Sequence, residues 1–192
     1  MRLLLVGAPG SGKGTQAERI AAHFGITHIS SGDLLRQHVR DDTATGALVR
    51  SYVEAGDLVP DAVVMDMLRK PVEAATAAGG YVLDGFPRTV QQAEVAYAVA
   101  SQLGAEVQVA IHLDVPTQVL VDRLLARGRG AEDARDIIEH RLEVFAEKTM
   151  PLIAYYAERE TLVTVEGWRP VEEVTRQIVA GVEHALATAD PS

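Results

Sequence analysis

A glycine-rich segment near the start of the chain has the residue types that bind phosphate. Residues 7–13 read Gly-Ala-Pro-Gly-Ser-Gly-Lys and fit the pattern G-x-x-x-x-G-K, after the apolar run Leu3–Val6 and before a helical pattern. Glycines in such a loop let backbone N–H groups converge on phosphate oxygens, and the helix N-terminus adds partial positive charge. Lys13 should reach the β- and γ-phosphates. We predict a loop that binds a nucleoside triphosphate rather than a glycine-rich turn without a ligand.

The pattern departs at the position after the lysine. Gly14 stands where Ser or Thr is usual, and the hydroxyl of Thr15 comes one residue later. A direct hydroxyl ligand for Mg²⁺ is therefore missing, so the nucleotide phosphates and water should hold most of the ion. The loop alone fits a GTPase, a motor ATPase or a kinase, but the sequence has no Asn-Lys-x-Asp segment of the kind that reads guanine in GTPases.

Four further segments follow the loop in a characteristic order. They are Ser-Gly-Asp-Leu-Leu-Arg at 31–36, Gly-Asp-Leu-Val-Pro at 56–60, Asp-Gly-Phe-Pro-Arg at 84–88 and Arg-Leu-Leu-Ala-Arg at 123–127. Together with the loop they resemble nucleoside monophosphate kinases, and the adenylate kinase family most closely, from Arg2 to about Ala187. The resemblance implies reversible phosphoryl transfer between Mg·ATP and AMP giving two ADP, with a role in adenine nucleotide homeostasis.

The resemblance also implies which residues form the site. The ATP residues are Gly10, Ser11, Gly12, Lys13, Gly14, Thr15, Arg123, Arg127 and Gly167. The AMP residues are Ser31, Arg36, Asp57, Leu58, Val59, Gly85, Phe86, Pro87, Arg88, Gln92, Arg129 and Arg141. The catalytic set is Lys13, Asp84, Arg88, Arg127, Arg129 and Arg141, and Asp84 should order the water shell of Mg²⁺.

The residue types fit these roles. A guanidinium offers a bidentate fork to phosphate oxygens, which suits Arg36 and Arg88 as clamps on the AMP phosphate. Gln92 can offer an acceptor and a donor to one edge of adenine. Ser31 and Gln92 favour AMP over UMP or CMP, because UMP/CMP kinases of this fold tend to carry Ala and Asn there. A UMP/CMP kinase and a non-enzymatic P-loop nucleotide sensor are the alternatives.

The lid is expected to be short. Only fourteen positions separate Arg127 from Arg141, and the chain has no cysteine, so no zinc is expected. The stretch 130–135 carries one residue more than the short-lid pattern, so Arg135 could replace Arg129 as the lid arginine. We expect a single domain over 1–192, an AMP-binding subregion at 30–59 and an exposed lid loop at 127–136.

The order of apolar and helical patterns predicts an α/β fold. Strands are expected at 3–6, 27–30, 81–83, 107–113 and 162–165, with helices between them, including 31–40, 43–55 and 135–159. Asp61 could cap a further helix that Pro71 would end. This alternation is typical of a parallel sheet, here the three-layer P-loop fold with five strands, a small AMP-binding helical insertion and a short lid.

The composition of the chain restricts its expected cellular location and its expected binding partners. The formal net charge of −9 argues against non-specific nucleic-acid binding, which needs clustered positive charge. The apolar run at the start is far shorter than the ~20 residues of a membrane span. We expect a cytoplasmic monomer whose partners are ATP, AMP and ADP, with no nucleic acid and no membrane.

Overall fold

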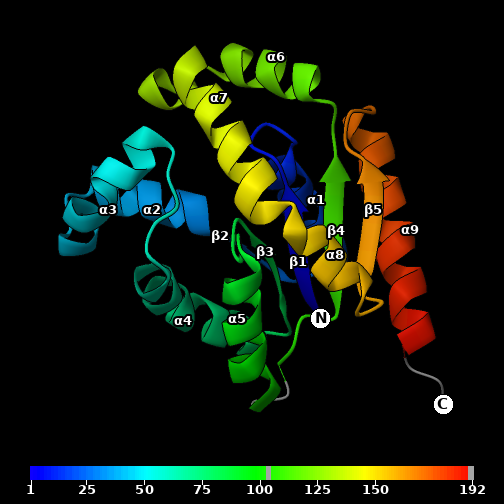
Figure 1. Ribbon diagram of the computed structural model, residues 1–192. Helices are drawn as coiled ribbons and strands as arrows, with labels where there is room; N and C mark the ends of the chain where they lie inside the picture. The colour runs from blue at the N-terminus through cyan, green and yellow to red at the C-terminus, as the bar shows by residue number, and fades with distance from the viewer. Residues whose placement is uncertain (103–104, 190–192) are drawn as a thin grey trace.

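A parallel sheet forms the centre of the molecule (Figure 1). The computed structural model describes residues 1–102 and 105–189, and within them five parallel strands pair in the order β2-β3-β1-β4-β5. In the central strand, Leu5 is level with Asp84 on one side and with Ile111 on the other. The predicted sheet is confirmed. Its strands are β1 (Arg2–Gly7), β2 (Thr27–Ser30), β3 (Tyr81–Asp84), β4 (Val109–Asp114) and β5 (Leu162–Glu166).

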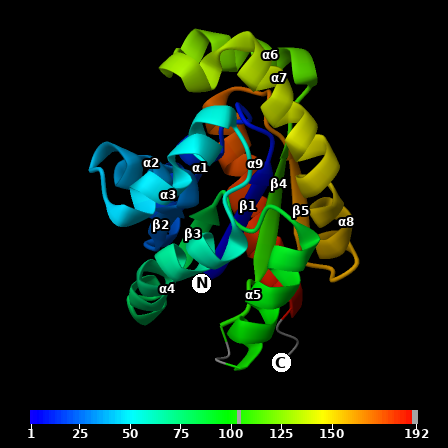
Figure 2. The same ribbon diagram turned by 60° about the vertical axis from the view of Figure 1, so that its left-hand side comes forward.

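Helices cover both faces of the sheet, as its apolar strands require. Leu3 and Leu5 pack into one core with α1 (Lys13–Phe24) and α9 (Val171–Ala189). Leu4 and Val6 point the other way, into a core with α4 (Asp61–Ala77), α5 (Val90–Gln102) and α8 (Pro151–Ala157). Figure 2 shows α9 behind the sheet and α5 in front of it. The three layers confirm the predicted α/β fold class.

Two groups of helices lie beyond the carboxyl end of the sheet. The first is α2 (Ser31–Arg40) and α3 (Ala44–Ala55), after β2. The second is α6 (Thr117–Arg127), the 3₁₀ turn η1 (Gly130–Asp133) and α7 (Arg135–Val144), after β4. The arrowheads of β4 and β5 point toward α6 in Figure 1. Open parallel sheets bind ligands at this end. No helix of the described residues is long and apolar enough to cross a membrane.

The fourth helix differs from the sequence prediction at both ends. Pro60 precedes it, Asp61 is its first residue, and it continues through Pro71 to Ala77. Proline removes one hydrogen bond from a helix and crowds the preceding turn. Here Leu68 before the proline and Ala75 after it are both buried in the same core. Burial of this common face outweighs the local cost of the proline, so the expected helix end at Pro71 was wrong.

Three other boundaries also differ from the prediction. The fourth strand begins at Val109, two residues later than expected. The helix expected over 135–159 is α7, a π-helical turn η2 (Phe145–Thr149) and α8. The stretch 127–136 is only partly an exposed loop, because it holds η1 and because Asp133 is 7% exposed. The Asp133 carboxylate is buried because it accepts hydrogen bonds from arginines. The polar character of the stretch, on which the prediction of a loop rested, does not indicate these bonds.

Candidate functional site

The phosphate-loop pattern lies between β1 and α1, as predicted. Gly12 adopts the left-handed conformation, with a φ of 93°, directly before Lys13 begins the helix. A residue with a β-carbon adopts that conformation only at a cost, so the turn favours glycine. The Lys13 ammonium donates to the backbone oxygens of Gly7, at 2.8 Å, and Ala8, at 3.0 Å. The loop therefore surrounds a positive charge at the head of a helix, the arrangement that binds phosphate.

The Lys13 side chain has a strongly perturbed acidity. Burial in the loop lowers its pKa from the usual 10.5 to about 8. The negative charge of Asp84 opposes this shift, while the positive charges of Arg88, Arg141 and Arg127 add to it. Desolvation and like charges both disfavour the ammonium form. Lys13 thus belongs to a concentrated positive cluster that a polyanionic ligand would neutralise.

Asp84 is the carboxylate of this cluster. It ends β3, is 8% exposed, and its Oδ1 is buried without a hydrogen-bond partner among the described residues. A buried carboxylate oxygen without a partner is costly in an apolar setting. Mg²⁺ prefers oxygen ligands and keeps several of its waters. The unpaired Oδ1 of Asp84 therefore fits a role in holding hydrated Mg²⁺.

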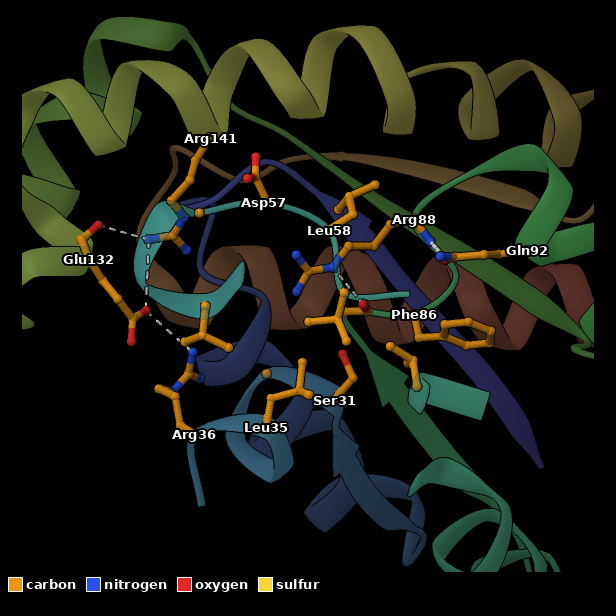
Figure 3. A pocket seen from close by; sticks show the side chains of 16 residues that line it. Ser31, Leu35, Arg36, Asp57, Leu58, Phe86, Arg88, Gln92, Glu132 and Arg141 are labelled. Carbon is orange, nitrogen blue, oxygen red and sulfur yellow. Dashed lines mark hydrogen bonds and ion pairs between the residues drawn. The ribbon is translucent and has the colours of Figure 1, made fainter. Parts of the chain in front are cut away.

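A pocket opens between α2, the segment 56–59 after α3, and the segment 85–88 after β3 (Figure 3). It brings together most of the residues predicted to contact AMP, and Glu132 in addition. Those predicted residues are Ser31, Arg36, Asp57, Leu58, Val59, Gly85, Phe86, Arg88, Gln92 and Arg141.

Ser31 and Gly85 lie against each other in the wall of this pocket. The Ser31 hydroxyl is buried and lacks a hydrogen-bond partner among the described residues. A β-carbon at position 85 would stand 2.5 Å from that hydroxyl oxygen, and Gly85 has a φ of +85°. Any side chain at 85 would therefore strain the backbone and block the hydroxyl. The wall leaves a polar group available to a ligand in the pocket.

A second pocket adjoins the first at the phosphate loop. Gly7, Pro9, Lys13 and Pro87 line it, and Gly85, Arg88 and Arg141 line both pockets. The Arg88 Nε donates to the carbonyl of Gly85 at 2.8 Å, which holds the guanidinium at the boundary. Burial and the nearby Arg36 lower the pKa of Arg88, and Asp84 opposes this shift. Two phosphate-bearing ligands in these pockets would meet at Arg88 and Arg141.

The lid arginines bind acidic side chains of η1. Asp133 accepts two bonds from Arg127, at 2.6 and 3.0 Å, and one from the backbone N–H of Arg129 at 2.8 Å. The Arg141 Nη1 lies 3.8 Å from Asp133 and donates to the backbone oxygen of Glu132 at 3.1 Å. These contacts fix η1 over the first pocket and hold three arginines near each other.

Arg129 and Arg135 occupy different surroundings. Burial and the positive charges of Arg127 and Arg36 lower the pKa of Arg129, which places it in the arginine cluster. The Arg135 side chain is 67% exposed and lies 3.8 Å from Glu139 of its own helix. The lid role, which the sequence left open between Arg129 and Arg135, stays a prediction.

The remaining ATP residues lie outside both pockets. Arg123 donates to the carbonyl of Gly167 at 3.0 Å and to that of Ser11 at 3.4 Å. Its guanidinium thus links the end of β5 to the phosphate loop. Thr15 is exposed on α1. Gly10, Ser11, Gly12 and Gly14 belong to the loop and the first turn of α1.

Sequence reasoning missed several polar contacts around these pockets. The Glu132 carboxylate lies 3.6 Å from Arg36 and 4.0 Å from Arg141, between two guanidiniums predicted to hold phosphate (Figure 3). The His140 Nε2 lies 2.7 Å from an oxygen of Asp57, which joins α7 to the segment after α3. Adjacent acids among lid arginines were the available signal for Glu132. Nothing in the sequence pairs positions 57 and 140.

The fold and site define a P-loop phosphotransferase with adjoining pockets for two phosphate-bearing ligands. The model of the family described as adenylate kinase matches residues 5–161. The chain is 44% identical over 179 residues to adenylate kinase 1 of Nostoc sp., covering 93% of this chain and 97% of the relative. It is 41% identical over 182 residues to the adenylate kinase of Rhodococcus erythropolis, covering 95% and 99%. The chain therefore belongs to the adenylate kinase family.

Proposed function

We propose that this phosphotransferase performs the reaction of its family, reversible transfer of the γ-phosphoryl group of Mg·ATP to AMP giving two ADP. The observation that supports this most is the pair of adjoining pockets that share Arg88 and Arg141. Phosphoryl transfer needs two nucleotides held in line and their negative charge neutralised. A shared pair of guanidiniums at the boundary meets both needs.

The AMP would lie in the first pocket. Its base would meet the unpaired Ser31 hydroxyl, Gln92, and the backbone of residues 57–59 and 85–87. Its phosphate would meet the guanidiniums of Arg36 and Arg88, whose forks match phosphate oxygens. Glu132 would release Arg36 and Arg141 to the substrate. No general base is needed, because the AMP phosphate is already ionised at neutral pH.

The ATP would lie along the phosphate loop. Its phosphates would accept from the backbone N–H groups of residues 10–15 and from Lys13, and the base would lie near Arg123 and Gly167. Lid arginines Arg127, Arg129 and Arg141 would surround the transferred group. Bound Mg²⁺ would neutralise phosphate charge, and the unpaired Asp84 Oδ1 would hold it through water.

Two mobile covers would exclude water from this site. We propose that residues 30–59 form the AMP-binding subregion and 127–136 the short lid, within one domain spanning 1–192. The ion pair of Arg36 with Glu132, at 3.6 Å, joins the two covers. Exclusion of water strengthens the electrostatic interactions of the site and prevents hydrolysis of ATP. We further propose a cytoplasmic monomer that acts on ATP, AMP and ADP in nucleotide biosynthesis.

A coupled assay with ATP and each of AMP, UMP, CMP and GMP tests the function. We expect ADP formation with AMP to exceed that with the other acceptors, and excess EDTA to abolish it. Comparable kcat/KM for AMP and UMP would indicate a UMP/CMP kinase. Nucleotide binding without turnover would indicate a sensor. Full activity in excess EDTA would refute the dependence on Mg²⁺.

A further inference from the structure

The side-chain amide of Gln92 is held from both ends. Gln92 is 4% exposed in the wall of the first pocket. Its Oε1 accepts from the backbone N–H of Arg88 at 2.7 Å, and its Nε2 donates to the Asp61 carboxylate at 2.6 Å. Asp61 begins α4, and Gln92 lies in the first turn of α5. Two elements thus converge on one amide.

These two partners allow the amide only one orientation. A carboxylate can only accept a hydrogen bond, and a backbone N–H can only donate one. If the amide turned by half a revolution, its oxygen would face the Asp61 carboxylate and its NH₂ group would face the Arg88 N–H. Both contacts would then be repulsive and both bonds lost. The bond from Arg88 comes from its backbone N–H, which a change of side chain leaves in place. Asp61 is therefore the partner of Gln92 that a substitution can alter.

The fixed amide has one lone pair and one N–H left for a ligand. Adenine presents an amino donor beside a ring-nitrogen acceptor, which matches an amide oxygen and N–H in that order. Hypoxanthine has the same shape but presents a carbonyl acceptor beside a ring N–H. A free glutamine amide could turn to match either base, whereas a fixed one matches only adenine.

We propose that Asp61 is a positioning residue that makes the acceptor site specific for adenine by preventing Gln92 from turning. The proposal rests on the proposed function, in which Gln92 reads the AMP base. Asp61 itself need not touch the substrate, because its carboxylate acts through the Gln92 amide. A site built to hydrogen-bond one base rejects an analogue that leaves its polar groups unpaired.

The test compares AMP with IMP, whose base is hypoxanthine, in the wild-type chain and in Asp61→Asn. The asparagine can donate as well as accept, so it permits both orientations of Gln92. We define the preference for AMP over IMP as the competitive inhibition constant of IMP divided by the KM for AMP. We expect this quotient to fall about tenfold in Asp61→Asn. The loss for AMP should fall on KM rather than on kcat.

Asp66→Asn is the matched control, because Asp66 is an exposed aspartate on the same helix. It should leave both constants unchanged. An Asp61→Asn preference within about threefold of wild type, with an unchanged melting temperature, would overturn the proposal. If Asp61→Asn folds poorly, Asp61→Ala also frees the amide and should weaken the preference likewise. Equal affinity of the wild-type chain for AMP and IMP would also overturn the proposal, whereas absence of AMP-dependent turnover would instead refute the proposed function.

Discussion

At the scale of single residues, the position of Arg88 should affect phosphoryl transfer more than that of any other residue. It lines both pockets, and its Nε bond to Gly85 aims the guanidinium at their boundary. A group there meets the acceptor phosphate before transfer and the shared phosphoryl group during it. Interactions that strengthen as transfer proceeds raise kcat, while interactions present equally throughout only lower KM. Arg88 should therefore affect both.

Replacing Arg88 by alanine should lower kcat/KM for AMP by about a hundredfold or more, because one such contact contributes ~3 kcal/mol to the transition state. The melting temperature should stay near that of the wild type. Arg135→Ala is the matched control, because Arg135 is exposed and pairs only weakly with Glu139. An exposed pair contributes ~0–1 kcal/mol. An Arg88→Ala enzyme within about threefold of wild type would contradict the assignment.

The acidity of Lys13 predicts a pH profile. With a pKa of about 8, Lys13 loses its charge in the free enzyme as the pH rises above that value. We expect kcat/KM for Mg·ATP to fall about tenfold per pH unit there, since this parameter reports groups of the free enzyme. Bound phosphates favour the ammonium form, so kcat should fall only at higher pH. Lys13→Arg should remove the alkaline decline, and a wild-type profile flat to about pH 9.5 would refute the assignment.

The same shift has a consequence for stability, with a defined sign. Between pH 8 and 10.5 the unfolded chain keeps the Lys13 proton and the folded chain does not. The unfolded state then binds more protons, so this group's contribution to the free energy of unfolding rises with pH across that window. Below pH 8 both states are protonated, and the cost of the buried ammonium is fully present.

At the scale of elements, η1 places carboxylates where substrate phosphates are expected. Glu132 lies 3.6 Å from Arg36 and 4.0 Å from Arg141. Its negative charge competes with the AMP phosphate for the same guanidiniums, so binding AMP requires these contacts to be replaced. Asp133 differs, because it is more deeply buried and holds Arg127 through two bonds.

Glu132→Gln should therefore lower the KM for AMP, by about twofold to fivefold, because a neutral amide competes less well for a guanidinium than a carboxylate does. Steady-state kinetics with varied AMP at saturating Mg·ATP measures this. Glu139→Gln, an exposed change on the neighbouring helix, should leave the KM unchanged. A raised KM in Glu132→Gln would show that the carboxylate instead orients Arg36 for substrate.

An element could be predicted from the sequence where residues adjacent in the chain determine it, and could not where tertiary contacts determine it. The strand, glycine loop and helix around Lys13 follow from adjacent residues, and the apolar run before Asp84 places that residue at a strand end. The helix end predicted at Pro71 was wrong because the burial of Leu68 and Ala75, which sustains the helix, is a tertiary effect. The bond between Asp61 and Gln92 joins residues 31 positions apart, and sequence spacing alone gives no sign of it.

At the scale of the whole molecule, the two pockets should act as one continuous site. They share five lining residues, which are Gly56, Leu58, Gly85, Arg88 and Arg141. Those residues come from the segment after α3, the segment after β3 and α7, so a ligand across the boundary would contact all three parts at once. Ligands that bind only the folded state stabilise it by mass action.

A single molecule that joins two adenosines through a phosphate chain long enough to span ATP and AMP should bind once per chain. At a thousand times its Kd it should stabilise the fold by ~4 kcal/mol, which is about 10 °C in melting temperature for a chain of this size. Arg88→Ala should lose much of this shift, because it removes a contact common to both pockets, while Arg135→Ala should retain it. Calorimetry gives the stoichiometry and a thermal melt gives the shift. Two molecules bound per chain, or a shift no larger than with ATP alone, would show that the pockets are filled independently and that Arg88 does not connect them.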